Sequence, residues 1–229
     1  MLLKLAPRTD LITIYLIVAV VAFLLGSIPF GYLLVRIFRG QDVRKTGSGN
    51  IGATNVARTG SKGLAVATLL LDAVKGYAAV AFAEWIPDHV AIDILKNAHA
   101  TAIIVDPHST YLLAALAALF VILGHMFTPW LGFKGGKGVA AAVGAFAAIA
   151  PRAVLISLAL FVVVVAITRY VSLGSILGAA VFPIAAYWLN PTMRDPKIMS
   201  LVAASALLII VRHHANIQRL LAGSENRLW

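Results

Sequence analysis

Three short segments of the chain concentrate residue types that could bind and transfer charged groups. The first, residues 46–58, alternates glycines with hydroxyl and amide side chains and ends at an arginine. Small residues let backbone N–H groups approach an anion closely, and an arginine adds a bidentate donor. The segment is therefore predicted to bind phosphate, through Ser48, Gly49, Asn50, Gly52, Thr54, Asn55 and Arg58.

The second segment, residues 132–138, places two lysines among four glycines just before an apolar stretch. The N-terminal N–H groups of a helix favour anions, so this loop is a stronger indication of a phosphate site. A positively charged anchor at the membrane surface would explain the lysines but not the density of glycine. The candidates in this loop are Lys134, Gly135, Gly136, Lys137 and Gly138.

The third segment follows the last apolar stretch of the chain. On a continuing helix, Arg212, Asn216 and Arg219 share one face, at spacings of four and three residues. Arginines that reach lipid headgroups would explain part of this pattern, but not the histidine and asparagine. The candidates are Arg212, His213, Asn216, Arg219 and Glu225, together with Ser172 at another predicted helix end, where a serine more often caps a helix.

Two familiar phosphate motifs in the first segment are rejected. Gly47, Gly49 and Gly52 match G-x-G-x-x-G, but a membrane helix rather than a strand precedes them, which argues against dinucleotide binding. Residues 47–54 approximate a P-loop, but Ala53 stands where that mechanism requires lysine. Neither a dinucleotide-dependent enzyme nor an NTPase is therefore predicted.

The composition places these segments in a membrane protein. Of 229 residues, 61% are apolar and 12% are charged, and this charged share is about half that of soluble proteins. A helix needs about 20 apolar residues to cross ~30 Å of hydrocarbon. Residues 11–35, 107–133 and 170–193 contain no Asp, Glu, Lys or Arg and are long enough. Because the chain has no cysteine, disulfides and thiolate catalysis are excluded.

Four further stretches are predicted to enter the membrane. Residues 63–83 are apolar except for Asp72 and Lys75, which share one helix face and form either a structural or a functional ion pair. Residues 138–151, 153–168 and 198–211 are short, and the first two could instead form a re-entrant pair. The predicted fold class is an all-α integral membrane protein, a polytopic bundle of seven transmembrane helices with five as the fallback, in a single domain over residues 1–229.

Charge asymmetry predicts the orientation of this bundle. All three candidate segments and the whole net charge of +10 fall on one predicted face, which the positive-inside rule makes cytoplasmic. The N-terminus is then outside and the C-terminus cytoplasmic, although Lys4 and Arg8 precede the first apolar stretch. Residues 85–110 are expected on the outer face, with a short interfacial helix.

The candidate residues resemble those of the bacterial acyl-phosphate:glycerol-3-phosphate acyltransferases, the PlsY family. The matching segments are residues 26–31 (GSIPFG), 48–58, 72–76 (DAVKG), His125 with 133–138, Ser172, and the group from Arg212 to Glu225. The resemblance implies a seven-helix inner-membrane enzyme whose active site is cytoplasmic. Such an enzyme transfers a fatty acyl group from acyl phosphate to the 1-hydroxyl of glycerol 3-phosphate, in the first acylation of bacterial phospholipid synthesis.

Roles follow from this resemblance as expectations. The implied partners are acyl phosphate, glycerol 3-phosphate and membrane lipids, with no nucleic acid, no cofactor and no metal, and the protein is expected to function as a monomer. The remaining candidates of the three segments are expected to bind substrate. The residues expected to be catalytic are Ser48, Arg58, Lys134, Ser172, His213 and Asn216.

Two proton-transfer mechanisms stay open at this point. None of the six histidines has an acid at the His-x-x-x-x-Asp spacing of other acyltransferases. Either His213 is the general base, or the acyl-phosphate oxygen takes the proton while His213 and Asn216 orient glycerol 3-phosphate; the second is preferred. Backbone N–H groups of the Ser48 and Gly135 loops are expected to stabilise the oxyanion. The acyl chain is expected in a lipid-open groove at Ser27 and Gly31.

Two other functions are weighed against acyl transfer. A carrier for phosphate or sugar phosphate would also use an intramembrane ion pair and basic vestibules. Residues 11–110 and 111–211 show no internal repeat, however, and the basic charge lies at one face. A non-catalytic lipid-binding subunit would tolerate replacement of Ser48 and Arg58.

Overall fold

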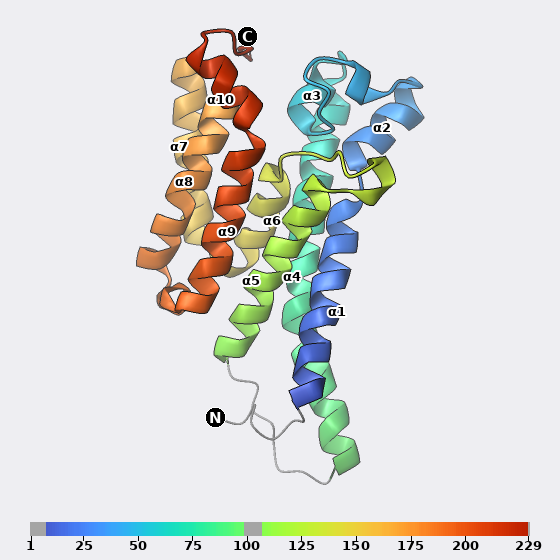
Figure 1. The fold of residues 1–229 in the computed structure, drawn as a ribbon, viewed down its shortest axis with the longest axis vertical. Coiled ribbons are helices and arrows are strands. Elements are labelled where there is room, and N and C mark those ends of the chain that lie inside the picture. Colours follow the sequence, from blue (N-terminus) through green and yellow to red (C-terminus); the bar gives the residue numbers. More distant parts are fainter. Residues whose placement is uncertain (1–7, 99–106, 229) are drawn as a thin grey trace.

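The computed structural model describes residues 8–98 and 107–228, and in these residues it contains helices and connecting loops but no strand (Figure 1). The predicted all-α class is confirmed for this part of the chain. The α-helices are α1 (Arg8–Ser27), α2 (Phe30–Arg39), α3 (Ala53–Ala57), α4 (Lys62–Ala98), α5 (Pro107–Met126), α6 (Val139–Ile149), α7 (Pro151–Thr168), α8 (Val171–Leu189), α9 (Pro196–Arg212) and α10 (His214–Leu221). Three short 3₁₀ helices are η2 (Val43–Lys45), η3 (Pro129–Leu131) and η4 (Pro191–Arg194).

The first predicted span is two helices rather than one. Pro29 has no N–H to donate, so the helical ladder stops at Ser27 and resumes as α2. α2 carries Arg36 and Arg39 in its last turn, and Gly40 ends it at a φ of 65°. The segment Ile12–Arg39 as a whole remains long and apolar enough to cross a membrane.

Within the described residues, five helical segments are long and apolar enough to cross a membrane, or six if the bent pair α9–α10 counts as one span. The chain is thus a multi-pass helical protein. The bend of 54° at His213 separates α9 from α10. α6 is the element that falls short of the predicted seven, since its 11 residues extend only about 16 Å. The next helix, α7, is long and apolar enough to cross a membrane with its 18 residues.

Small residues allow the central helices to pack closely. α1 packs against α5, α4 against α6 and α7 against α8, and these three pairs make the most extensive contacts between helices. A Cβ atom at Gly26 or Gly124 would overlap the backbone of the partner helix in the first pair, and one at Gly76 or Gly144 would do so in the second. Glycine therefore sets the interhelical distance in this half of the bundle. α7, α8 and α9 form a second layer beside α6 (Figure 1).

The loops that carry the candidate residues gather at one end of the bundle. α2, α3 and α10 lie at the upper end in Figure 1, whereas α1 begins at the lower end. α4 continues to Ala98, so it includes part of the predicted 85–110 interfacial segment as a continuation of a long helix. Residues 107–110 of that segment are the first residues of α5, while residues 99–106 and the residues before Arg8 lie outside the described residues.

Candidate active site

A polar cavity of about 820 Å³ lies among α3, α4, α8, α10 and the two glycine-rich loops. It brings together residues from all three segments predicted to bind phosphate. Most of the predicted catalytic residues line it. Those lining it are Ser48, Arg58, Ser172, His213 and Asn216, with Asn50, Gly52, Thr54, Asn55, Lys137, Gly138 and Glu225 of the predicted substrate-binding set.

One side chain, Asn55, holds the first loop in shape. Its amide Nδ2 donates to the carbonyl oxygens of Val43, Thr46 and Asn50 at 3.0, 2.9 and 2.7 Å, and its Oδ1 accepts from the Ser48 N–H at 2.9 Å. Asn55 is only 2% exposed. Its hydrogen bonds therefore fix the shape of the loop beside the cavity. The sequence predicted a direct contact with substrate for this residue instead.

Three backbone N–H groups of this loop, those of Ser48, Gly49 and Gly52, donate to acceptors within the loop. Besides Ser48, Gly52 N–H donates to Asn50 Oδ1 at 2.8 Å and Gly49 N–H donates to the Thr46 carbonyl at 3.1 Å. Gly47 adopts a φ of 56°, and a Cβ there would overlap Asn55 Oδ1. The glycines thus serve a tight turn and close packing. The expected oxyanion donor at Ser48 N–H is already occupied.

The second loop shows the same pattern for a different reason. Gly135 N–H donates to the Met126 carbonyl at 3.0 Å and Gly136 N–H to the His125 carbonyl at 2.9 Å. A Cβ at Gly136 would overlap the imidazole ring of His125, and one at Gly135 would overlap backbone. Close contact with the end of α5 therefore explains these two glycines, and their N–H groups, which were expected to bind an anion, donate to carbonyl oxygens of α5.

Only one of the two lysines in this loop reaches the cavity. Lys137 Nζ donates to Asn216 Oδ1 at 2.6 Å and lines the cavity wall. Lys134, which was expected to be catalytic, is exposed and does not line the cavity. The structure thus distinguishes Lys137 as the cavity residue from Lys134, whereas the sequence indicated both lysines equally as phosphate ligands.

Arg212 lies behind the second loop rather than in the cavity. Its Nη2 donates to the carbonyl oxygens of Gly136, Gly135 and Met126 at 3.3, 3.4 and 3.5 Å, and its guanidinium lies 5.4 Å from the centre of the Phe127 ring. Arg212 was expected to contact substrate. In the structure it bonds to the backbone of the second loop and does not line the cavity.

Glu225 connects the third segment to α8. Its Oε1 accepts from Ser172 Oγ at 2.9 Å and from Asn216 Nδ2 at 2.6 Å, while its Oε2 accepts from Arg219 Nε at 2.7 Å. Because Asn216 Oδ1 also accepts from Lys137, the chain of hydrogen bonds runs from α8 to the second loop. Ser172, Arg219 and Glu225 therefore support the cavity wall.

These contacts shift the pKa values of two cavity groups. Burial lowers the pKa of Lys137 to about 8; nearby Glu225 opposes this effect, whereas the positive charges of Arg219, Arg58 and Arg212 add to it. Burial alone would raise the pKa of Glu225, but the hydrogen bonds from Asn216, Arg219 and Ser172 outweigh burial and lower it. Near neutral pH the cavity thus holds a lysine ammonium beside a glutamate carboxylate.

His213 is oriented by its own helix. Its Nδ1 lies 2.8 Å from the Ile209 carbonyl oxygen. A carbonyl can only accept, so in the neutral imidazole Nδ1 carries the proton and Nε2 is left as an acceptor. His213 is 2% exposed, yet its side chain lines the cavity.

Cations outnumber acids in the cavity wall. The described lining residues include four cations, Arg58, Lys62, Lys137 and Arg227, and two acids, Asp72 and Glu225. Lys62, Arg227 and His125 were not among the predicted site residues. His125 could have been found, because it is a polar residue inside an otherwise apolar span, whereas nothing in the sequence distinguishes Lys62 and Arg227 from other surface cations.

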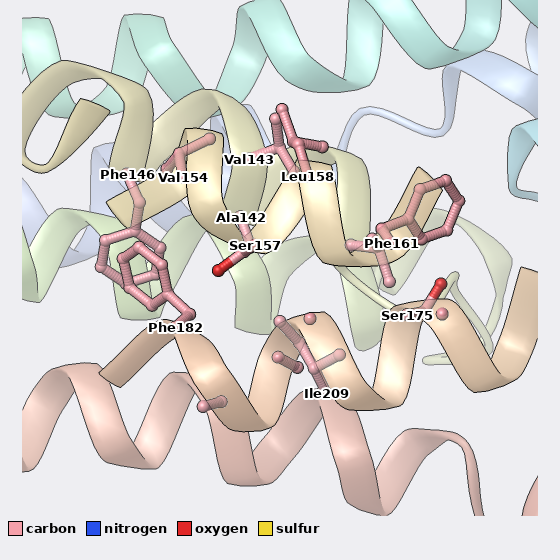
Figure 2. A pocket seen from close by; sticks show the side chains of 15 residues that line it. Ala142, Val143, Phe146, Val154, Ser157, Leu158, Phe161, Ser175, Phe182 and Ile209 are labelled. Atoms are coloured by element: carbon pink, nitrogen blue, oxygen red, sulfur yellow. The ribbon is translucent and has the colours of Figure 1, made fainter. Parts of the chain in front are cut away.

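A narrow apolar cavity of about 70 Å³ adjoins the polar one, between α6, α7, α8 and α9 (Figure 2). Val139, Phe161 and Ser175 line both cavities, so the two are neighbours. We call this cavity the apolar slot. The rings of Phe146 and Phe182, whose centres are 4.5 Å apart, lie at one end of the slot, and Ser157 lies between that end and Phe161 (Figure 2).

The acyl groove expected at Ser27 and Gly31 does not coincide with this slot. Ser27 is fully buried, donates to the Leu24 carbonyl and accepts from Trp130 Nε1. A Cβ at Gly31 would overlap the Ile51 carbonyl. Both residues line neither of the two cavities and instead allow tight packing beside the Pro29 break.

A family model and individual relatives match this chain over most of its length, and all of them are glycerol-3-phosphate acyltransferases. The model of the glycerol-3-phosphate acyltransferase family matches residues 16–223. A glycerol-3-phosphate acyltransferase of Mesorhizobium japonicum is 44% identical over 214 residues, which cover 93% of this chain and 96% of the relative. One of Geobacter sulfurreducens is 44% identical over 212 residues, with the same coverage.

Two crystal structures have a similar fold. Both are of PlsY, an integral membrane glycerol 3-phosphate acyltransferase, in its glycerol 3-phosphate and lysophosphatidic acid forms. The first has a TM-score of 0.75 and 32% identity, and the second a TM-score of 0.73 and 31% identity. Each similarity covers 93% of this chain and 94% of the other.

Proposed function

The chain belongs to the glycerol-3-phosphate acyltransferase family, and from this premise we propose that it acylates glycerol 3-phosphate with an acyl phosphate. The products are 1-acylglycerol 3-phosphate and inorganic phosphate, and the reaction is an early step of phospholipid synthesis. The observation that carries this proposal is the contact between a cationic cavity and an apolar slot. The cavity suits two phosphates, and the apolar slot suits part of an acyl chain that leaves the cavity.

Positive charge is the first requirement of this reaction. Unit charges ~5 Å apart repel by about 3 kcal/mol at an effective dielectric near 20, and phosphate dianions would repel several-fold more. Arg58, Lys62 and Lys137 line the cavity from α3, α4 and the second loop, so they approach it from three directions. These cations offset the repulsion and stabilise negative charge that develops on the carbonyl oxygen.

The bond changes then require little acid–base chemistry from the protein. The 1-hydroxyl oxygen attacks the acyl carbonyl carbon, the carbon–oxygen bond to phosphate breaks, and the hydroxyl proton passes to a phosphate oxygen of the departing group. Phosphate is a good leaving group, so positioning contributes more than a strong base. His213 Nε2 and the Asn216 amide orient glycerol 3-phosphate in this mechanism.

This mechanism predicts that His213→Gln lowers turnover without abolishing it. Glutamine keeps a polar group in the cavity but cannot act as a general base. We expect kcat to fall about 10- to 100-fold with glycerol 3-phosphate still bound, measured by steady-state kinetics. Complete loss of turnover with unchanged binding would instead favour His213 as the base.

The assay that tests the function supplies purified protein with acyl phosphate and glycerol 3-phosphate and measures lysophosphatidic acid. Acyl-CoA is run in parallel, and only the acyl phosphate reaction is expected to give product. Uptake of glycerol 3-phosphate into sealed vesicles without ester formation would overturn the proposal in favour of a carrier.

The membrane placement belongs to the same proposal. We place the protein in the bacterial inner membrane as a single-domain monomer, with the cavity on the cytoplasmic side and seven membrane-inserted elements: α1 with α2, α4, α5, α6, α7, α8, and α9 with α10. The support is the excess of basic residues on the loops of the cavity end. This side also gives access to the water-soluble substrate.

A further inference from the structure

Three buried titratable side chains form a cluster at the wall of the polar cavity. Asp72 and Lys75 come from α4 and His125 from the end of α5, and they are 2%, 4% and 4% exposed. Lys75 Nζ lies 2.7 Å from Asp72 Oδ1, which in turn lies 3.5 Å from His125 Nδ1. Ionisable groups inside a membrane protein are costly and usually functional. The mechanism above does not use this cluster.

The lysine end of the cluster reaches the break between α1 and α2. Lys75 Nζ donates to the Ile28 carbonyl oxygen at 2.8 Å, directly before Pro29. A second contact joins the same break to the turn between α5 and η3, which precedes the second loop, because Thr128 Oγ1 donates to the Ser27 carbonyl at 2.6 Å. The cluster thus ties α4 to a backbone kink beside the first glycine-rich region.

The histidine end of the cluster supports the second loop. The His125 ring lies directly against Gly136, where a Cβ would overlap its Nε2 atom. The Gly136 N–H donates to the His125 carbonyl at 2.9 Å. Any rotation of this ring would therefore displace the loop that presents Lys137 to Asn216.

The charges of the cluster balance at the point where it meets the cavity. Asp72 and His125 line the cavity, while Lys75 lies behind them. An unpaired carboxylate in this wall would repel a phosphate, but the 2.7 Å contact with Lys75 offsets its charge. The carboxylate can then lie 3.5 Å from His125 Nδ1 without weakening anion binding.

We propose that Asp72, Lys75 and His125 form a positioning network that fixes the second loop relative to the α1–α2 break and so sets the affinity for glycerol 3-phosphate. This inference rests on the proposed function, in which Lys137 and Asn216 lie beside that substrate. The three are positioning residues: they act through Gly136 and Lys137 and leave the reacting atoms to other groups.

The test compares Asp72→Asn, Lys75→Met and the double variant Asp72→Asn/Lys75→Met with wild type. Each single change leaves an uncompensated buried partner and is expected to lower the melting temperature. The double variant removes both charges, so its melting temperature should return close to that of wild type. Its KM for glycerol 3-phosphate should nevertheless stay about 10-fold or more above wild type, with kcat within about 3-fold.

Ser205→Ala is the matched control. Ser205 is also a fully buried polar residue, but its hydroxyl bonds only to the Leu201 carbonyl of its own helix. This variant should leave the KM unchanged.

Two outcomes would overturn the inference. If the KM of the double variant recovers together with its melting temperature, the cluster only stabilises the fold. If kcat collapses while the KM stays constant, Asp72 acts on the reacting atoms. Failure of the wild type to form lysophosphatidic acid in the same assay would overturn the proposed function instead, so the two failures are distinguishable.

Discussion

The charge of Lys137 is expected to affect how the activity depends on pH. Its ammonium group is hydrogen-bonded to Asn216, and burial lowers its pKa to about 8. Below that pH the group is charged and attracts phosphate; above it the charge is lost. Because the folded-state pKa is depressed, the useful charged form disappears as pH rises through 8, well before an ordinary lysine would titrate.

We therefore predict that kcat/KM for glycerol 3-phosphate falls above pH 8, approaching about tenfold per pH unit if only the charged form binds. The measurement is a profile from pH 6.5 to 9.5 at constant ionic strength. Lys137→Arg is the control, since a guanidinium stays charged throughout this range. Its profile should lack the fall above pH 8 even if its overall rate is lower. A fall at the same pH in both proteins would assign the titration to another group.

Residue identity was largely predictable from the sequence, but residue role was not. Small, hydroxyl and basic residues in the three loops indicated an anion site, and most of them do line one cavity. The N–H groups of Gly135 and Gly136 donate to carbonyl oxygens at the end of α5, because these two glycines pack closely against His125 and Met126. Spacing along the chain cannot distinguish an N–H group that faces a ligand from one that faces a carbonyl of another helix.

At the scale of elements, the apolar slot between α6, α7, α8 and α9 is the feature that sequence patterns missed. Four helices contribute to it, and their side chains read as ordinary membrane residues, such as Val143, Leu158 and Ala179. From Phe161 to Val154 along α7 the slot extends about 10 Å. This is shorter than one leaflet of the hydrocarbon core, ~15 Å, so in the proposed function a long acyl chain fills the whole slot and extends beyond it.

Ser157→Phe should consequently change acyl-chain selectivity. Ser157 lines the slot from α7 (Figure 2), and a phenyl ring there would occupy the space of several methylene groups. We predict that kcat/KM for a 16-carbon acyl phosphate falls about 10-fold more than that for an 8-carbon one, with the KM for glycerol 3-phosphate unchanged. Both values come from competition assays with mixed donors.

The control for this prediction is Ala159→Phe. Ala159 is an exposed residue on the same helix and does not line the slot. Its substitution adds a phenyl ring of the same size outside the slot. Equal losses for the two donors in Ser157→Phe would show that the acyl chain lies elsewhere.

Helix boundaries illustrate the limit of hydropathy at this scale. Long uncharged stretches predicted the positions of α5 and α8 well, because burying a charge in hydrocarbon is costly. The division of the first span at Pro29 and the extension of α4 to Ala98 were not predicted. Hydropathy records whether a segment can enter a membrane, while its kinks and ends depend on contacts such as that between Lys75 and Ile28.

At the scale of the whole molecule, the orientation and the number of crossings rest on charge and length. The cavity end carries the basic loops, and α6 is too short to cross alone. α6 ends at Ile149 and α7 begins at Pro151, so the exposed Arg152 marks the level that the pair reaches. If α6 and α7 complete two crossings, Arg152 must meet water on the side opposite the cavity.

Cysteine labelling can decide on which side of the membrane each loop lies. Because the natural sequence contains no cysteine, the unsubstituted protein serves as the negative control. Leu221→Cys marks α10 at the cavity end, where Leu221 is 85% exposed, and Lys197→Cys marks the start of α9. An impermeant maleimide added to intact cells should label Lys197→Cys and Arg152→Cys but not Leu221→Cys, and inside-out vesicles should reverse the pattern. Protection of Arg152→Cys from both sides would make α6 and α7 a re-entrant pair within a five-crossing bundle. Labelling of Leu221→Cys from outside would contradict the proposed cytoplasmic position of the cavity.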